Sequence, residues 1–127
     1  YTYARRRESL TSTLSRAVRL RNAAVALDGT SQTTVYTVPA GHDAVLKNII
    51  ICETSGNATP VTLELTDASA SATYKLLGSK SVAANDFVLL ALELNLNEGD
   101  IIKLTAGTAN RIEAVLTIDE LFLANHS

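Results

Sequence analysis

Tryptophan and methionine are absent from this sequence of 127 residues, which has only two phenylalanines, two prolines and one cysteine. The core must therefore be built from Val, Leu, Ile and Ala, in a single domain of ordinary size. The lone Cys52 excludes an internal disulfide, cannot form a metal site by itself and is compatible with synthesis in a reducing compartment. The longest wholly apolar run, residues 87–92, is too short to cross a bilayer, so no membrane association is expected.

Charge is distributed unevenly along the chain. The net charge is −2, yet residues 1–22 contain six arginines and one glutamate, whereas residues 23–127 contain five basic and twelve acidic side chains. We therefore divide the chain into a basic N-terminal arm, residues 1–22, and an acidic domain, residues 23–127. Ser and Thr, rather than an apolar core, follow the first arginines, so no signal peptide is expected.

Two conformations are compatible with the arm. A short amphipathic helix is indicated by the spacing of Leu10, Leu14, Ala17 and Val18, whereas the alternation around Leu20 is typical of a strand. We expect an irregular or partly helical arm to about residue 17, and then a strand.

The arm is also the predicted partner-binding segment. Arginine forms bidentate pairs with carboxylates, which favours an acidic protein surface as its partner. Nucleic acid is disfavoured because the rest of the chain is acidic, and a merely solvated arm is the third alternative. The predicted partner-binding residues are Arg5, Arg6, Arg7, Leu10, Leu14, Arg16, Arg19 and Arg21.

From about residue 23 onward, the pattern predicts an all-β domain. Residues 61–66 alternate between apolar and polar side chains, as a half-buried strand does. Turn-forming clusters separate the apolar runs, and we find no helical period among them, which favours an antiparallel, jelly-roll-like β-sandwich of seven or eight strands. The predicted strands are residues 33–38, 44–52, 61–66, 74–77, 87–96, 101–106 and 112–123, the last with a bulge near Asp119.

No catalytic or metal-binding pattern emerges. His42 is the best candidate for a base, but Asp43 beside it would point to the opposite face of a strand, so we interpret this pair as the polar tip of a hairpin. Cys52 ends an apolar run and is interpreted as a small buried hydrophobe. Four acidic residues could bind calcium but lack the spacing of an EF-hand loop: Glu53, Asp67, Glu98 and Asp100. We expect neither enzymatic activity nor a cofactor.

Residues 87–92 are apolar on both faces of the strand that they are expected to form. One face of each sheet in a two-layer sandwich meets water, so an apolar outer face predicts a contact with a neighbouring subunit or with the arm. We assign Val88, Leu90 and Leu92 to the core, because their alternation continues downstream. Phe87 and Leu89 are then the predicted subunit contacts.

Two segments resemble the small β-sandwich structural proteins of tailed bacteriophages. The first, TTVYTVPAGHDAVLKNIIICETSGNATPVTLEL, contains a Tyr-x-Val-Pro-Ala-Gly corner, an apolar strand, a Ser-Gly turn and an alternating strand. The second, LNLNEGDIIKLTAG, contains a Gly-Asp turn before the final hairpin. The resemblance covers residues 24–123 and does not include the arginines of the arm.

The resemblance implies a non-enzymatic virion protein, most like a capsid cement (decoration) protein. Such a protein would be synthesised in the host cytoplasm and would bind an acidic surface of the major capsid protein on the outside of the shell. A homotrimer is expected, because capsid lattices offer three-fold positions. The alternative is a tail, neck or fibre component whose β-sandwich binds a carbohydrate or receptor.

Overall fold

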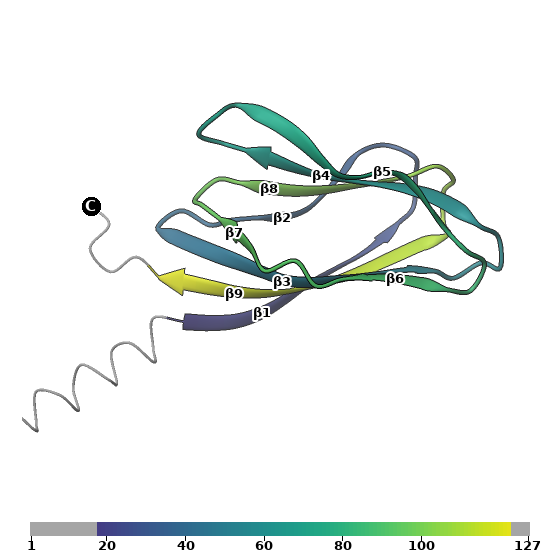
Figure 1. Cartoon of the computed structure of the whole chain (residues 1–127), viewed down its shortest axis with the longest axis horizontal. Helices are drawn as coiled ribbons and strands as arrows, with labels where there is room; N and C mark the ends of the chain where they lie inside the picture. Colours follow the sequence, from purple (N-terminus) through teal and green to yellow (C-terminus); the bar gives the residue numbers. More distant parts are fainter. Residues whose placement is uncertain (1–17, 123–127) are drawn as a thin grey trace, which may run out of the picture.

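The computed structural model describes residues 18–122, and these residues form two antiparallel β-sheets that lie face to face (Figure 1). The predicted all-β sandwich is therefore confirmed, with nine strands in the described part of the chain rather than seven or eight. No helix able to span a membrane occurs among residues 18–122. The strands are β1 (Val18–Leu27), β2 (Thr33–Thr37), β3 (His42–Glu53), β4 (Thr59–Asp67), β5 (Ala72–Val82), β6 (Phe87–Leu90), β7 (Leu94–Leu96), β8 (Ile101–Ala106) and β9 (Ile112–Phe122).

The chain crosses repeatedly between the two sheets. Sheet A has the order β1-β9-β3-β6, with β7 also paired to β3, and sheet B has the order β2-β8-β4-β5. Only β4–β5 and β6–β7 follow one another within the same sheet. The first and last strands, β1 and β9, are neighbours over their whole length, from Val18 opposite Leu121 to Leu27 opposite Ile112.

The core fills the space between the sheets, and alternation along each strand creates it. In β9, Ile112, Ala114, Leu116 and Ile118 are buried and the residues between them are exposed. Strand β8 shows the same period, and β3 keeps it except at its bulge. Burial of one such Leu or Ile side chain contributes about 1.5–3 kcal/mol, so the aliphatic core can supply the stability that aromatic residues would otherwise provide.

The predicted strand at residues 87–96 is wrong in one respect, because it is two strands. β6 pairs with β3 through Leu90 opposite Ile49, and β7 pairs with β3 through Leu94 opposite Leu46. Between these pairs residues 91–93 stand opposite only residues 47 and 48 of β3, and Glu93 has a positive φ of 45°. The two sides are unequal in length, so the pairing is interrupted there, beside the bulge of β3 against β9.

Two further expectations need correction. The short strand expected at residues 74–77 is part of β5, because bulges around residues 76 and 78–79 let the chain stay paired with β4 while its alternation is lost. The expected hairpin with His42 and Asp43 at its tip is also wrong. β2 lies in sheet B and β3 in sheet A, so residues 39–41 form a corner between the sheets. His42 and Asp43 are the first residues of β3 and pair with β9.

Candidate interaction surface

The outer face of sheet A carries a continuous apolar row. In register across β1, β9, β3 and β6 lie Ala24, Val115, Ile50 and Leu89. All four are exposed, and Leu89 exposes 54% of its surface. We call these four residues the apolar row. Exposed apolar side chains that adjoin one another across several strands are typical of a contact with another molecule.

The next row toward the end of the sheet extends this surface. Ala26, Glu113, Cys52 and Phe87 lie in register across the same four strands. Phe87 is more than half exposed, and Cys52 is half-buried on the outward side of β3 rather than in the core. The interpretation of Cys52 as a buried core residue is therefore wrong.

Sheet B has a different outer face. The corresponding row across β2, β8, β4 and β5 is Thr34, Lys103, Glu64 and Lys75. Charges of opposite sign alternate in this row, and such cross-strand pairs stabilise a sheet face that meets water. The contrast between the two outer faces identifies sheet A as the side of the sandwich that is suited to binding a partner.

Acidic groups surround the apolar row. Asp43, Glu113 and Asp119 point outward from the strands of sheet A, and Glu93 lies in the break between β6 and β7. Lys47 is the one basic side chain among the strand residues of this face within residues 18–122. Its Nζ lies 2.9 Å from Oε1 of Glu93. This ion pair raises the pKa of Lys47 and lowers that of Glu93. The face is thus apolar at its centre and acidic overall.

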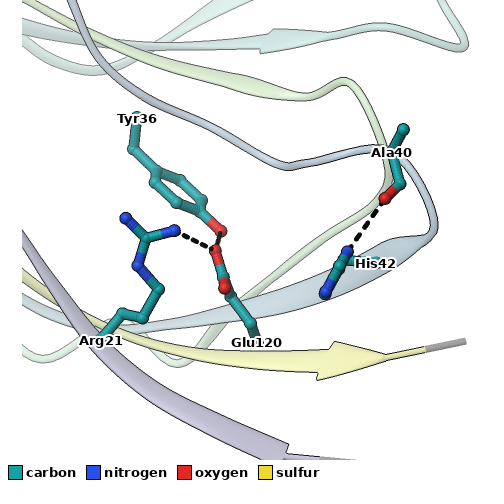
Figure 2. Close-up of polar contacts among 5 residues, drawn as sticks. All are labelled: Arg21, Tyr36, Ala40, His42 and Glu120. Atoms are coloured by element: carbon teal, nitrogen blue, oxygen red, sulfur yellow. Dashed lines mark hydrogen bonds and ion pairs between the residues drawn. The ribbon is translucent and has the colours of Figure 1, made fainter.

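A buried polar network lies between the sheets at the other end of β9 (Figure 2). The carboxylate of Glu120 is 1% exposed, and its Oε2 accepts hydrogen bonds from the hydroxyl of Tyr36 at 2.6 Å and from Nη1 of Arg21 at 3.2 Å. Burial and the bond to Glu120 raise the pKa of Tyr36 above its ordinary value. Arg21, a predicted partner-binding residue, is therefore engaged within the molecule.

His42 has no catalytic partner in the described part of the chain. Its Nδ1 donates to the carbonyl oxygen of Ala40 at 3.0 Å, as Figure 2 shows, and its ring contacts the edge of Phe122 at a centroid distance of 5.4 Å. Asp43 instead accepts a bond from the side chain of Asn97. Both residues stabilise the corner at which the chain passes from sheet B to sheet A.

Glu53, considered as a calcium ligand, organises the loop that follows β3. Its buried carboxylate accepts hydrogen bonds from the hydroxyl of Ser55 and from the backbone N–H groups of Ser55, Gly56, Asn57 and Asn85. Burial opposes the charged form, yet these bonds, led by that from the Ser55 hydroxyl, lower the pKa of Glu53 to about 2. The carboxylate is saturated with donors and leaves little capacity for a cation.

Asp100 plays a similar role at the opposite loops. It accepts backbone bonds from Ala68 at 2.9 Å and from Asn97 at 2.8 Å, which joins the loop after β4 to the turn before β8. In that turn Gly99 has a φ of 86°, which favours glycine. No group of three or more His, Cys, Asp or Glu side chains within residues 18–122 is arranged to hold a metal ion.

The predicted contact residues have different outcomes. Phe87 and Leu89 are exposed on the outer face of sheet A, while Val88 and Leu90 pack against the core. Leu92 was assigned to the core, and this is wrong: it lies in the break after β6 and is exposed. Arg19 is exposed on β1. Outside the described residues lie Arg5, Arg6, Arg7, Leu10, Leu14 and Arg16.

Of the apolar row, sequence reasoning named Leu89 alone. Ala24 and Val115 were not identified, because the outward sides of their strands also carry polar residues, such as Asn22 in β1 and Glu113 in β9. The apolar runs at 23–27 and 114–116 were the available signal, since a strand buried on one face does not need three consecutive apolar residues.

No family model matches this sequence, and no curated protein matches it. Solved structures do share its fold. A chain from the pili known as Bacillus endospore appendages is 10% identical, with 85% of this chain and 90% of that chain covered and a TM-score of 0.54. A chain of the acid-stable capsid of Helicobacter pylori bacteriophage KHP30 is 13% identical, with 85% and 90% covered and a TM-score of 0.50.

The third likeness is to a much longer chain. A chain of the T13 viral particle of IBDV, infectious bursal disease virus, is 7% identical and has a TM-score of 0.53. The match covers 84% of this chain but only 31% of that one. At these identities the likenesses show a shared β-sandwich fold, which occurs in subunits of virions and of pili.

Proposed function

We propose that this protein is a non-enzymatic structural component of a virion, and specifically a cement protein that binds the outside of a bacteriophage capsid. The observation that carries the proposal is the apolar row on the outer face of sheet A. A sandwich that acts alone in water would have polar groups there, as sheet B has. The face is built for a permanent contact, which a shell component requires.

The strand order supports the virion class. If β6 and β7 are counted as one interrupted strand, the order β1-β9-β3-β6 opposite β2-β8-β4-β5 corresponds to an eight-stranded jelly roll. This arrangement recurs in viral capsid proteins. The fold shared with chains of the KHP30 capsid and the IBDV particle agrees with that class.

Within residues 18–122, the groups best suited to catalysis are held by the fold itself, which agrees with the structural role proposed here. Within residues 18–122, His42 binds a backbone carbonyl, and the buried carboxylates of Glu53, Asp100 and Glu120 are each occupied by donors from the fold itself. A catalytic carboxylate or histidine needs a face open to a substrate.

A cement protein also needs an attachment to the shell. The arginines at residues 5–7 form the most concentrated positive charge in the sequence. We propose that they bind an acidic surface of the major capsid protein, and that three copies associate around a three-fold position of the lattice. The protein would then be located on the capsid surface after synthesis in the host cytoplasm.

No observation favours the alternative of a carbohydrate-binding tail or fibre module. Glycan sites usually need exposed aromatic platforms that lie together. Among residues 18–122 the exposed rings are dispersed, with Tyr74 on β5, Phe87 on β6 and Phe122 at the end of β9. The cavity of about 300 Å³ beside sheet B is lined by Thr30, Pro60, Thr62, Ser79, Thr105, Ala106 and Gly107, which include no aromatic ring.

The attachment is tested with particles that lack the protein. Purified full-length protein is added, the particles are pelleted, and occupancy is measured at low and high salt. We expect saturable binding that weakens as salt rises and that is reduced when Arg5, Arg6 and Arg7 are all replaced by Ala. Exposed ion pairs contribute about 0.2–1 kcal/mol each, so the triple replacement is needed to produce a clear effect.

The matched control replaces the exposed Lys75 and Lys80 of the edge strand β5 and the half-buried Lys103 of β8 by Ala, which removes the same charge elsewhere. This control should bind as the wild type does. Equal occupancy of the arginine variant at both salt concentrations would contradict the electrostatic attachment, and absence of any binding to the shell would contradict the cement role.

A further inference from the structure

We infer that the outer face of sheet A binds residues 9–17 of a neighbouring copy of this chain. The inference deepens the proposed function, on which it rests, because it assigns a partner to the same surface. In this arrangement the distal arginines bind the capsid, and the part of the arm next to β1 joins one copy to the next.

The chemistry of the face specifies its partner. Its centre is the apolar row, and around it lie the carboxylates of Asp43, Glu113 and Asp119. Two such faces would not pack against each other readily, since each would place negatively charged carboxylates near those of the other. An apolar segment with basic character fits the face instead.

Residues 9–17 have that composition. The segment SLTSTLSRA contains Leu10, Leu14 and Arg16, and it has no acidic side chain. Nine residues span about 14 Å as a helix and about 30 Å when extended. The apolar row spans three distances between neighbouring strands, or about 14 Å. The segment is therefore long enough to cover the row in either conformation.

The start of β1 indicates a neighbouring copy rather than the same chain. To lie on its own sheet, the arm would have to reverse direction immediately before Val18. Residues 1–17 contain no Gly, Pro, Asn or Asp, and of the common turn residues they contain only Ser, whose hydroxyl supports turns more weakly. A chain that continues beyond β1 without reversing leads away from its own sheet.

The base of the arm carries a further apolar contact. Leu20 is 78% exposed, and Val18 pairs with the exposed Leu121 on the same outward side of sheet A. These residues continue the apolar character of the arm into the described fold. An arm that reaches a neighbour would bring this cluster against that neighbour as well. Because the donor and acceptor surfaces differ, the contact is head-to-tail and closes into a ring when the rotation permits.

Photo-crosslinking of the purified full-length protein tests the inference without any particles. Benzoylphenylalanine replaces Leu14, and ¹⁴N-labelled and ¹⁵N-labelled chains are mixed, irradiated and digested. Mass spectrometry should find links from position 14 to the strands around Ile50 and Leu89, and about half of them should join chains of different label. Links only within one label would overturn the assignment to a neighbour, and an absence of links to this face would overturn the inference altogether.

Self-association provides the second measurement. Leu89→Asp and Leu14→Asp should each weaken it at least about tenfold in sedimentation velocity. Leu14 precedes β1 in the sequence, so its replacement separates a lost contact from a lost fold of residues 18–122. The control is Tyr74→Asp, which places the same charge at an equally exposed site on β5 and should change the association less than about twofold. Unchanged association in Leu14→Asp would overturn the inference.

These results are independent of the test on particles. If the cross-link fails while the protein still attaches to the shell, the proposed contact between the arm and a neighbouring copy is overturned and the cement role stands. If the cross-link forms but the protein does not attach to the shell, the cement role is overturned and the contact between copies stands.

Discussion

The replacement Tyr36→Phe probes the buried network that connects the two sheets. It removes only the hydroxyl, which lies 2.6 Å from Oε2 of Glu120, and leaves the ring in the core. The carboxylate is 1% exposed, so water cannot replace the lost donor, and Arg21 remains as its partner. A hydrogen bond to a charged group contributes about 1.5–3 kcal/mol, and we expect Tyr36→Phe to lower the free energy of unfolding by about 2 kcal/mol.

Equilibrium unfolding in urea measures this loss. With a denaturant dependence of about 1–3 kcal/mol/M, a loss of about 2 kcal/mol lowers the midpoint by roughly 1 M. Tyr74→Phe is the matched control, because its hydroxyl belongs to a ring that is 54% exposed and should contribute less than about 0.5 kcal/mol.

A double-mutant cycle with Glu120→Gln identifies the cause of the loss. The introduced amide would keep an acceptor for Tyr36 but remove the charge, and a neutral hydrogen bond contributes about 0.5–1.5 kcal/mol. We therefore expect Tyr36→Phe to cost about 1 kcal/mol less in that background than in the wild type. The reasoning is refuted if Tyr36→Phe is as stable as the wild type, or if it costs the same in both backgrounds.

The remaining predictions concern the loops. The pKa of Glu53 is about 2 in the fold and 4.5 without its partners, so its contribution is complete above pH 4.5 and is lost as pH falls toward 2. In urea unfolding from pH 7 to pH 2.5, Glu53→Gln should have a lower free energy of unfolding than the wild type, and the difference should narrow as the pH falls. A difference that stays constant across this pH range would contradict the prediction. Gly41→Ala and Gly99→Ala should each cost about 1–3 kcal/mol because both glycines have positive φ. Gly99→Ala should be the more costly, since a Cβ added at position 99 would lie 3.2 Å from Cβ of Ala68, whereas one added at position 41 meets nothing within 4 Å. A higher thermal unfolding temperature for Gly99→Ala than for Gly41→Ala would disprove this explanation.

The fold class could be predicted because apolar and polar side chains alternate along a strand that is buried on one face. Residues 61–66 and 101–106 alternate clearly between apolar and polar side chains. The first segment lies within β4, and the second is β8. Residues 87–96 could not be divided correctly, because a run that is apolar on both faces has no period to mark the break. The break lies opposite residues 47 and 48, where β3 also bulges against β9, and no pattern within residues 87–96 reports this long-range pairing.

The candidate surface was predictable only in part for the same reason. Leu89 was found because its whole strand is apolar, whereas Val115 became part of the row only when β9 was placed between β1 and β3. Tyr36 and Glu120 are 84 residues apart, and nothing near either residue indicates their hydrogen bond. The sequence contains the members of each cluster, but long-range pairing decides which of them meet.

We propose that this sandwich is a shell component whose outer sheet A face is covered in the assembly. Cryo-electron microscopy of virions that contain the protein would show both its position and the contacts of this face. We expect density for the sandwich on the outside of the capsid at three-fold positions, with the apolar row around Ile50 and Leu89 buried against another chain. Density at the neck or tail alone, or an apolar row open to solvent in the assembled particle, would contradict it.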